Sequence, residues 1–269
     1  MHSKCTLPQN TSLAKNLYLQ TVMEKYAHDL IVPYKDSGIS KKNQVADMFD
    51  HIAYRYDFLN RFLSGGIDIL WRKKAISYLK DSQPKNLLDV ATGTADVAIM
   101  AEKILKIPSI TGIDISEGML EIGRKKLAAR SLGDKIKLLH GDSAALPFDN
   151  NSFDAVTVAF GVRNFQQLEK GLAEILRVLR PGGKLIVLEF SRPKLPAVKM
   201  FYNFYMKRIA ANIGRVVSKN NCAYEYLDES IQKFPEGKEF LKILNSLGYL
   251  NTTFKPLSLG ICSIYCGTK

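Results

Sequence analysis

The sequence predicts an α/β protein with a mostly parallel sheet of seven strands and helices on both faces. Two observations predict this fold class. From residue 84 onward, short apolar runs alternate with amphipathic stretches, as expected for βαβ units with right-handed crossovers. Several of these runs are apolar at consecutive positions, which is typical of central strands buried on both faces of a parallel sheet.

The expected elements follow one another without an internal repeat. Apolar runs predict five strands, and two more close the sheet near the end of the chain. Their positions are 86–90, 110–113, 136–139, 155–160, 185–188, 252–256 and 261–266. Helices are expected between and after them, at 97–105, 117–129, 168–179 and 237–247.

Three regions of the chain differ in pattern. Residues 1–42 are polar with scattered apolar positions and predict an irregular N-terminal arm. Residues 43–83 predict a helical cap, whose second helix covers about 69–79. Residues 84–269 predict the sheet domain, in which an aromatic-rich insertion at about 193–234 breaks the alternation.

Composition narrows the class of protein. The 269 residues are 46% hydrophobic and 24% charged, which excludes disorder and collagen-like repeats. No apolar run approaches the ~18 residues of a membrane span. Thirty-eight Lys and Arg against 26 Asp and Glu give a net charge of +12, which indicates an anionic partner or solubility alone. The four cysteines and four histidines show no disulfide or zinc-ligand spacing, so no metal is expected. Since no secretory signal is evident, a cytoplasmic setting is expected.

The turn after the first expected strand is a candidate binding element. It holds Asp89 in the strand and Gly93 and Thr94 just before the next helix. A ligand of an open parallel sheet lies beyond the carboxyl ends of the strands, and N–H groups at a helix start favour a carboxylate or a phosphate. Ala91 and Ala95 stand where a dinucleotide fingerprint has glycine, which disfavours a nicotinamide dehydrogenase. A tight structural turn would have the same sequence.

Acidic residues follow the second and third expected strands. Asp114 lies about 20 residues after Gly93, where a carboxylate can accept both hydroxyls of a ribose; a helix N-cap is the alternative. Asp142 is placed to accept from an adenine amino group, with the Ser143 N–H meeting a ring nitrogen. An ordinary strand-end cap is the alternative for this pair. Ala159, at the end of the fourth strand, would lie beside such a cofactor.

Three further stretches carry more specific motifs. They are 56–64 with Trp71 after it, 160–164 with the sequence Phe-Gly-Val-Arg-Asn, and 177–191 with Arg-Pro-Gly-Gly before Glu-Phe-Ser. Together with the turn and the two acids, they resemble the UbiE/MenG family of class I S-adenosylmethionine-dependent methyltransferases. The resemblance covers roughly residues 44–269. That family methylates a carbon of the quinol ring in menaquinone and ubiquinone biosynthesis.

This sequence departs from the family pattern at four positions. Leu59 replaces the usual Met, Asp68 the usual His, and Arg180 the usual Lys before Pro-Gly-Gly. Ala159 replaces a Ser or Thr, so a hydroxyl contact with the cofactor is lost there. Asp68 puts any role of that histidine in doubt.

The resemblance implies a Rossmann-like fold and S-adenosyl-L-methionine as the cofactor. Its cofactor-binding residues carry over as Thr94, Asp114, Asp142 and Ser143, and Asp89, Gly93 and Ala159 are close neighbours.

The resemblance also implies roles toward the acceptor. Arg163 is expected to stabilise a developing phenolate or to orient a water, and Asn164 to fix a ring oxygen. Tyr56 and Asp57 are expected to close the pocket from the other side. For Tyr56 a place in the core is the alternative, and for Arg163 a surface ion pair.

The implied substrate is a polyprenylated quinol. Demethylmenaquinol is favoured because residues 64–74 are more similar to menaquinone-only relatives; the alternative is 2-methoxy-6-polyprenyl-1,4-benzoquinol. An RNA methyltransferase and a non-catalytic cofactor-binding module are the other interpretations, and no nucleic acid is expected.

Residues 201–205 and the N-terminal helices are candidates for an apolar path for the isoprenoid tail. Arg72-Lys73-Lys74 and Lys207-Arg208 could attract an anionic membrane, or be solvated helix faces. A homo-oligomer is left open.

Overall fold

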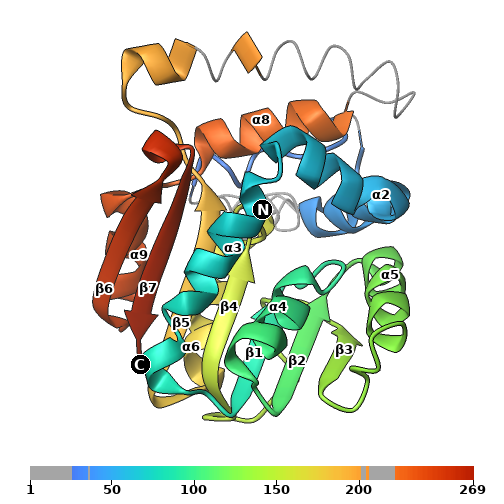
Figure 1. The fold of residues 1–269 in the computed structure, drawn as a ribbon. Helices are drawn as coiled ribbons and strands as arrows, with labels where there is room; N and C mark the ends of the chain where they lie inside the picture. Colours follow the sequence, from blue (N-terminus) through green and yellow to red (C-terminus); the bar gives the residue numbers. More distant parts are fainter. Residues whose placement is uncertain (1–25, 36, 201–203, 206–221) are drawn as a thin grey trace, which may run out of the picture.

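Seven strands form one sheet in the order β3-β2-β1-β4-β5-β7-β6 (Figure 1). The computed structural model describes residues 26–35, 37–200, 204–205 and 222–269. The strands are β1 Asn86–Val90, β2 Ser109–Asp114, β3 Ile136–His140, β4 Phe153–Ala159, β5 Leu179–Phe190, β6 Leu250–Leu257 and β7 Cys262–Thr268. The first five are parallel, and β7 is antiparallel to both β5 and β6. This topology confirms the predicted mostly parallel sheet.

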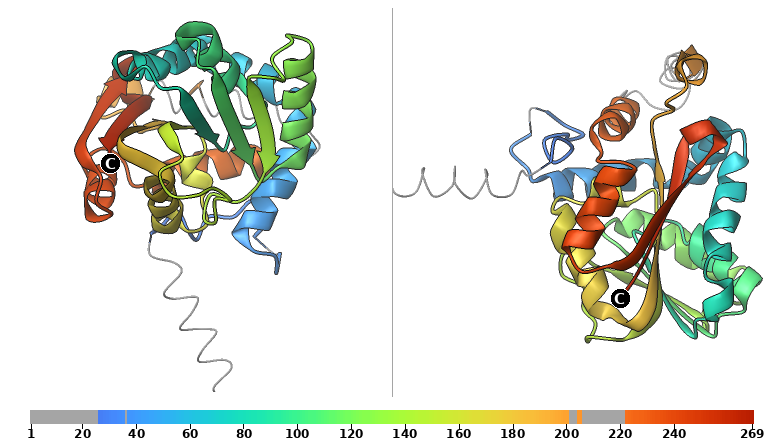
Figure 2. Two further views of the ribbon diagram at one scale, coloured as in Figure 1. Left: turned by 90° about the horizontal axis from the view of Figure 1, so that it is seen from below. Right: turned by 90° about the vertical axis from the view of Figure 1, so that its left-hand side faces the viewer.

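Helices cover both faces of the sheet (Figure 2). They are α2 Lys41–Ser64, α3 Ile67–Ser77, α4 Asp96–Leu105, α5 Glu117–Ala128, α6 Leu168–Val178, α8 Cys222–Lys233 and α9 Lys238–Ser246. The described residues also contain three short 3-10 helices: η1 Lys80–Ser82 before β1, η2 Val162–Asn164 after β4, and η3 Ser258–Gly260 between β6 and β7. The α2 and α8 helices lie across the end of the sheet to which the β4 arrow points, and they form the roof of the site described below.

The apolar runs form strands because each face of the sheet has its own core. Along β5, Leu185 and Val187 pack in the cluster that contains α6 and α9 residues. Ile186 and Leu188 point the opposite way, into the cluster with α3, α4 and α5 residues. Side chains of a strand alternate between faces, so a strand with helices on both sides needs apolar residues at every position.

Apart from the first strand, the observed boundaries differ from the expected ones at most ends, usually by one or two residues, and two differences affect the motifs. The fifth strand begins at Leu179 rather than 185, so the Arg-Pro-Gly-Gly motif is part of β5. The fourth covers Phe153–Ala159 rather than 155–160. Phe160 ends it because its φ of 59° is left-handed and cannot continue a strand.

The cap helix α2 has a defined start and end. The Ser40 hydroxyl accepts from the Asn43 N–H, and Gly65 closes the helix with a φ of 57°, where glycine is preferred. The helix therefore begins at Lys41, inside the segment expected as an irregular arm. Of the described part of that arm, residues 26–35 consist of turns and coil, and the Lys41 ammonium donates to the His28 carbonyl.

Parts of the aromatic insertion can be placed. Residues 196–200 are helical, and α8 lies at the C-terminal end of the insertion. Phe201, Tyr202 and the pair Lys207-Arg208 lie outside the described residues. Over the ranges that the structure describes, no helix is both long and apolar enough to cross a membrane.

Candidate active site

A cavity of about 370 Å³ lies at the carboxyl ends of β1, β2 and β4. We call it the strand-end cavity; its floor comes from the strand ends and includes Gly93, Asp114, Asp142, Ser143 and Ala159. Its roof comes from α2 and includes Lys42, Phe49 and Tyr56. β1 has β2 on one side and β4 on the other. The chain therefore builds the sheet first outward through β2 and β3 and then on the other side from β4 onward. Open α/β sheets bind ligands at the point where the order of the strands reverses in this way.

Asp114 presents a carboxylate to this cavity. Its Oδ2 accepts from the Gly93 N–H at 2.7 Å, and its Oδ1 accepts from the Ser116 N–H at 2.9 Å. Burial raises the pKa of Asp114, while the backbone N–H groups oppose that shift. The helix N-cap is Ser116, whose hydroxyl accepts from Met119 N–H. The alternative reading of Asp114 as the cap is therefore wrong.

The two loops beside this cavity, after β1 and after β4, contain left-handed positions. Ala91, Gly93, Ala95 and Phe160 have φ values of 54°, 55°, 65° and 59°. Left-handed backbone costs a residue with a Cβ about 1–2 kcal/mol, and such strain gathers at functional sites. Ala91 and Ala95, the two positions that stand in for glycines, thus keep a glycine-like backbone.

Two predicted cofactor residues lie behind the cavity wall. Asp89 is buried and accepts from the hydroxyls of Thr92 and Thr157, both at 2.6 Å; burial raises the pKa of Asp89 to about 6, against these hydrogen bonds. Thr94 donates to Asp57 at 2.6 Å. Neither Asp89 nor Thr94 is among the residues that line the cavity, so their side chains hold the loop in place.

Asp142 has a partner that the sequence did not predict. Its Oδ2 lies 3.0 Å from Nζ of Lys42, and its Oδ1 accepts from Ala144 N–H at 2.9 Å. Lys42 comes from the first turn of α2, 100 residues earlier in the chain, and Asp142 follows β3. No local motif signals such a pair, because only the docking of α2 over the sheet brings it together.

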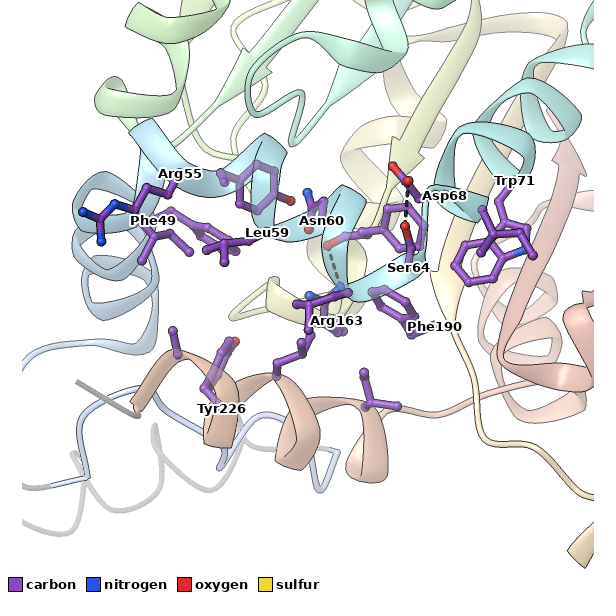
Figure 3. A pocket seen from close by; sticks show the side chains of 18 of the residues that line it. Phe49, Arg55, Leu59, Asn60, Ser64, Asp68, Trp71, Arg163, Phe190 and Tyr226 are labelled. Carbon is purple, nitrogen blue, oxygen red and sulfur yellow. Dashed lines mark hydrogen bonds between the residues drawn. The ribbon is translucent and has the colours of Figure 1, made fainter. Parts of the chain in front are cut away.

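A second cavity of about 450 Å³ lies beside the first, between α2, α3, η2 and α8 (Figure 3). We call it the cap cavity. Its lining is mostly apolar and includes Leu59, Trp71 and Phe190. Phe49, Tyr56 and Phe160 line both cavities, so the two spaces share a wall.

Arg163 and Asn164 stand at this shared wall. Both belong to η2, but Arg163 lines the cap cavity and Asn164 the strand-end cavity. Figure 3 shows Arg163 between α2 and the α8 helix that carries Tyr226. The sequence predicts that both residues reach past the cofactor; of the two, only Arg163 lies on the cap-cavity side of the wall.

Arg163 is buried and held from one side. Its NH1 donates to the Phe160 carbonyl at 2.6 Å and to Glu189 Oε1 at 2.7 Å. Burial alone would lower the pKa of the guanidinium, but the Glu189 carboxylate outweighs it and the net pKa is raised. The Nε–H is buried and has no hydrogen-bond partner among the described residues. The surface ion pair considered for Arg163 is therefore wrong: the pair is internal.

Asn164 is oriented by a residue from the insertion. Tyr226 of α8 donates from its hydroxyl to Asn164 Oδ1 at 3.0 Å. Burial raises the pKa of Tyr226, so it stays protonated and remains a donor. Since Tyr226 lies 62 residues further along the chain, sequence reasoning missed it; the aromatic-rich insertion at about 193–234 is the signal that could have found it.

Asp57 lies away from both cavities. It accepts from Thr94 and forms an ion pair with Lys126, which also binds Asp96. It does not line the strand-end cavity or the cap cavity. The expectation that Asp57 itself closes the pocket is therefore not met by its position; it links α2 to α5 and to the first loop.

Comparisons with known proteins point to one family. Residues 38–269 match the model described as the ubiE/COQ5 methyltransferase family. A demethylmenaquinone methyltransferase of Bacteroides fragilis is 44% identical over 244 residues, 91% of this chain and 99% of that protein. The ubiquinone/menaquinone biosynthesis C-methyltransferase UbiE of Geobacter sulfurreducens is 42% identical and covers 85% of this chain and 90% of its own length.

A solved structure outside these relatives shares the fold. A SAM-dependent methyltransferase of Thermotoga maritima superimposes with a TM-score of 0.58 at 19% identity, over 83% of this chain and 99% of that one. At this identity the match concerns the fold alone. It agrees with the class I methyltransferase fold that the sequence predicts.

Proposed function

Since this chain belongs to the ubiE/COQ5 methyltransferase family, we propose that it transfers the methyl group of S-adenosyl-L-methionine to a ring carbon of demethylmenaquinol, giving menaquinol. Relatives from Bacteroides fragilis and Thermus thermophilus, 44% and 42% identical, are named demethylmenaquinone methyltransferase. The observation that carries the proposal is the shared wall. A cavity with two carboxylates and an apolar cavity meet at Tyr56 and Phe160, as a nucleoside methyl donor and a lipid-like acceptor require.

The residues of the strand-end cavity fit this cofactor. The Asp114 carboxylate uses one lone pair of each oxygen on backbone N–H groups, and a carboxylate has about four acceptor sites. It can therefore also accept the ribose hydroxyls. At Gly93 a Cβ would have only Tyr56 Cε1 within reach, at 4.0 Å, so the backbone is open to a close approach. Asp142, Ser143 and Ala159 would line the base, and when bound the cofactor supplies an electrophilic methyl group.

In our proposal Arg163 acts on the acceptor. Its guanidinium stays charged near neutral pH, so it cannot serve as the base. Its partnerless Nε–H, on a side chain that lines the cap cavity, would donate to a quinol oxygen. When that hydroxyl loses its proton to water, the guanidinium stabilises the phenolate. The phenolate would then push electron density onto the ring carbon, which is otherwise a poor nucleophile. That carbon would bond to the methyl group as the methyl–sulfur bond breaks, and it would then lose its own proton to water, while the oxygen regains one, to restore the aromatic quinol.

Asn164 and Tyr56 would set the geometry of the transfer. Asn164, held through Tyr226, orients the ring oxygen nearest the strand-end cavity. Tyr56 lines both cavities and would keep water out of the space where donor and acceptor meet. Alignment of this kind, rather than acid–base chemistry, supplies much of the acceleration of such transfers. Asp57 would act indirectly, by fixing Thr94 and the loop.

A second acceptor has specific support. The Geobacter sulfurreducens relative is named for both ubiquinone and menaquinone biosynthesis, so 2-methoxy-6-polyprenyl-1,4-benzoquinol is the competing substrate. Incubation of the protein with labelled S-adenosyl-L-methionine and each reduced precursor, followed by mass spectrometry, tests the proposal. We expect demethylmenaquinol to gain one methyl group. Cofactor binding without transfer to either quinol would instead support a non-catalytic module.

We further propose that the protein is cytoplasmic and contacts an anionic membrane, where a polyprenylated quinol resides. The exposed basic residues are fewer than expected: Arg72 of the predicted basic cluster is buried and paired with Asp68, which leaves Lys73 and Lys74 exposed. A homo-oligomer stays an open prediction.

A further inference from the structure

One face of the helical cap is apolar and exposed. Tyr54, Phe58 and Phe62 are 89%, 65% and 52% exposed, and their spacing of four residues places them on one side of α2. The stripe continues on α3 with Ile67 and Leu70, 37% and 60% exposed. Exposed apolar groups of this size mark sites where a soluble protein meets a membrane or another protein.

The stripe is also the rim of the cap cavity. Tyr54 and Ile67 line the cavity while they remain exposed. Tyr205 of the insertion lines it too, and donates from its hydroxyl to the Leu63 carbonyl at the end of α2. Phe204, next to it, is 59% exposed. An apolar exposed surface thus borders the mostly apolar cavity.

The exposed charges at the α3 end of the stripe are basic. On α3 the only acid, Asp68, is buried and paired with Arg61 and Arg72, so the exposed charges of that helix are Lys73 and Lys74. On α2, Arg55 follows Tyr54 and is exposed, while two exposed acids, Asp47 and Asp50, lie one to two turns before Tyr54. An apolar helical face flanked by cations is typical of helices that lie in the interface of anionic bilayers.

We infer that this face, formed by Tyr54, Phe58, Phe62, Ile67 and Leu70, docks on the surface of an anionic lipid bilayer. The quinol would then pass from the bilayer into the cap cavity with its ring first and its isoprenoid tail along the stripe. The inference rests on the proposed function for the identity of the lipid-like substrate, but the docking itself does not depend on catalysis. A complementary protein surface is the competing occupant.

The test uses the full chain and two matched double variants. F58S/F62S removes two exposed rings that do not line the cap cavity. I104S/L250S removes two apolar side chains that are 41% and 60% exposed elsewhere, on α4 and β6. Binding to phosphatidylglycerol-containing and pure phosphatidylcholine vesicles is measured by flotation at low and high salt. K73E/K74E tests the charge contribution.

We expect the wild-type chain and I104S/L250S to bind anionic vesicles equally. F58S/F62S should bind at least about tenfold more weakly, because it lacks two aromatic rings that the bilayer would bury. K73E/K74E should lose the dependence on anionic lipid. Equal binding of wild type and F58S/F62S overturns the inference. So does a wild-type chain that stays off all vesicles, which would assign the stripe to a protein partner.

A second measurement separates this inference from the proposed function. Turnover is followed with a quinol bearing a single isoprene unit in solution and with the long-chain quinol in vesicles. F58S/F62S should match wild type on the short quinol and fall at least about tenfold on the vesicle-borne one. The wild type and the variants could all fail to methylate the short quinol while F58S/F62S still binds vesicles more weakly than the wild type. In that case the proposed function fails and the docking surface stands.

Discussion

Arg163 and Glu189 form an internal ion pair, with NH1 and Oε1 2.7 Å apart and side chains that are 7% and 0% exposed. Glu189 lies on β5 and also accepts from the backbone N–H groups of Arg163 and Phe190. The strand therefore fixes the guanidinium through one carboxylate. The pair lies deep in the protein, yet Arg163 still lines the cap cavity.

Two variants of this ion pair should separate its effect on stability from its effect on catalysis. Arg163→Met leaves the Glu189 charge buried and alone, so we expect the free energy of unfolding to fall by about 3–5 kcal/mol. The double variant R163M/E189Q removes both charges and should recover most of that loss. Its kcat should nevertheless stay at least about 100-fold below wild type, since the phenolate loses its stabilising charge. Chemical unfolding and steady-state kinetics measure the two effects, and a double variant with wild-type turnover would falsify the role of Arg163.

The Tyr226 hydroxyl should contribute to kcat as well as to the free energy of unfolding. Tyr226→Phe removes the hydrogen bond to Asn164, and Tyr249→Phe removes a matched buried one, to the Leu172 carbonyl at 2.8 Å. Both should lose about 1 kcal/mol of unfolding free energy. Only Tyr226→Phe should lower kcat, by roughly tenfold, because Asn164 is then free to turn. Equal kcat values for the two variants would mean that Tyr226 is structural only.

Asp114 should control cofactor affinity. Asp114→Asn weakens acceptance of the ribose hydroxyls, so the Kd for S-adenosyl-L-methionine in calorimetry should rise by about 10- to 100-fold. Asp154→Asn is the matched control: Asp154 also accepts from two backbone N–H groups, those of Lys85 and Asn86, but at the opposite end of the sheet. Its variant should leave the Kd unchanged. Similar effects of both variants would show that only general stability is altered.

Acid should weaken the attachment of the N-terminal segment through His28. Burial and the Lys41 ammonium lower the pKa of His28 to about 3, although Asp29 Oδ1 lies 3.3 Å from its Nε2. Because the unfolded chain takes up the proton first, near pH 6.5, the stabilising contribution is complete above that pH and declines as the pH falls toward 3. At pH 5 the loss is about 2 kcal/mol.

The variant His28→Gln should abolish that decline. The difference in unfolding free energy between wild type and variant should shrink by about 2 kcal/mol from pH 7.5 to pH 5 in urea titrations. His51→Gln serves as the control, because His51 is exposed with 71% of its side chain accessible. A pH response of wild type that persists in His28→Gln would locate the titrating group elsewhere.

The strands and the loop were predictable because their signals are local. Consecutive apolar positions at 185–188 identified a strand buried on both faces, and the two cores on either side of β5 explain why. Asp114 was found because an acid at the end of the second strand must lie near the first loop in any parallel sheet. The ends of β4 and β5 were missed, since the left-handed Phe160 and the strand-forming Pro-Gly-Gly have no reliable sequence signal.

The side-chain assignments show the limit of that reasoning. Thr94 and Asp57 were placed at the cofactor and at the pocket entrance, yet they bond to each other away from both cavities. A motif fixes which residues are near a site but not which way a side chain points. Lys42 and Tyr226, which face Asp142 and Asn164, carry no motif at all.

The sequence alone therefore determined the sheet, its first loop and the acids at its strand ends, because each depends on residues close together in the chain. Tertiary structure alone decided that two cavities share a wall, that Arg163 is buried against Glu189, and that an apolar stripe borders the cap cavity. Those features arise where α2 and α8 cross the ends of the strands. Packing between segments that are far apart in the chain is set by the shape of the whole fold, which no local pattern encodes.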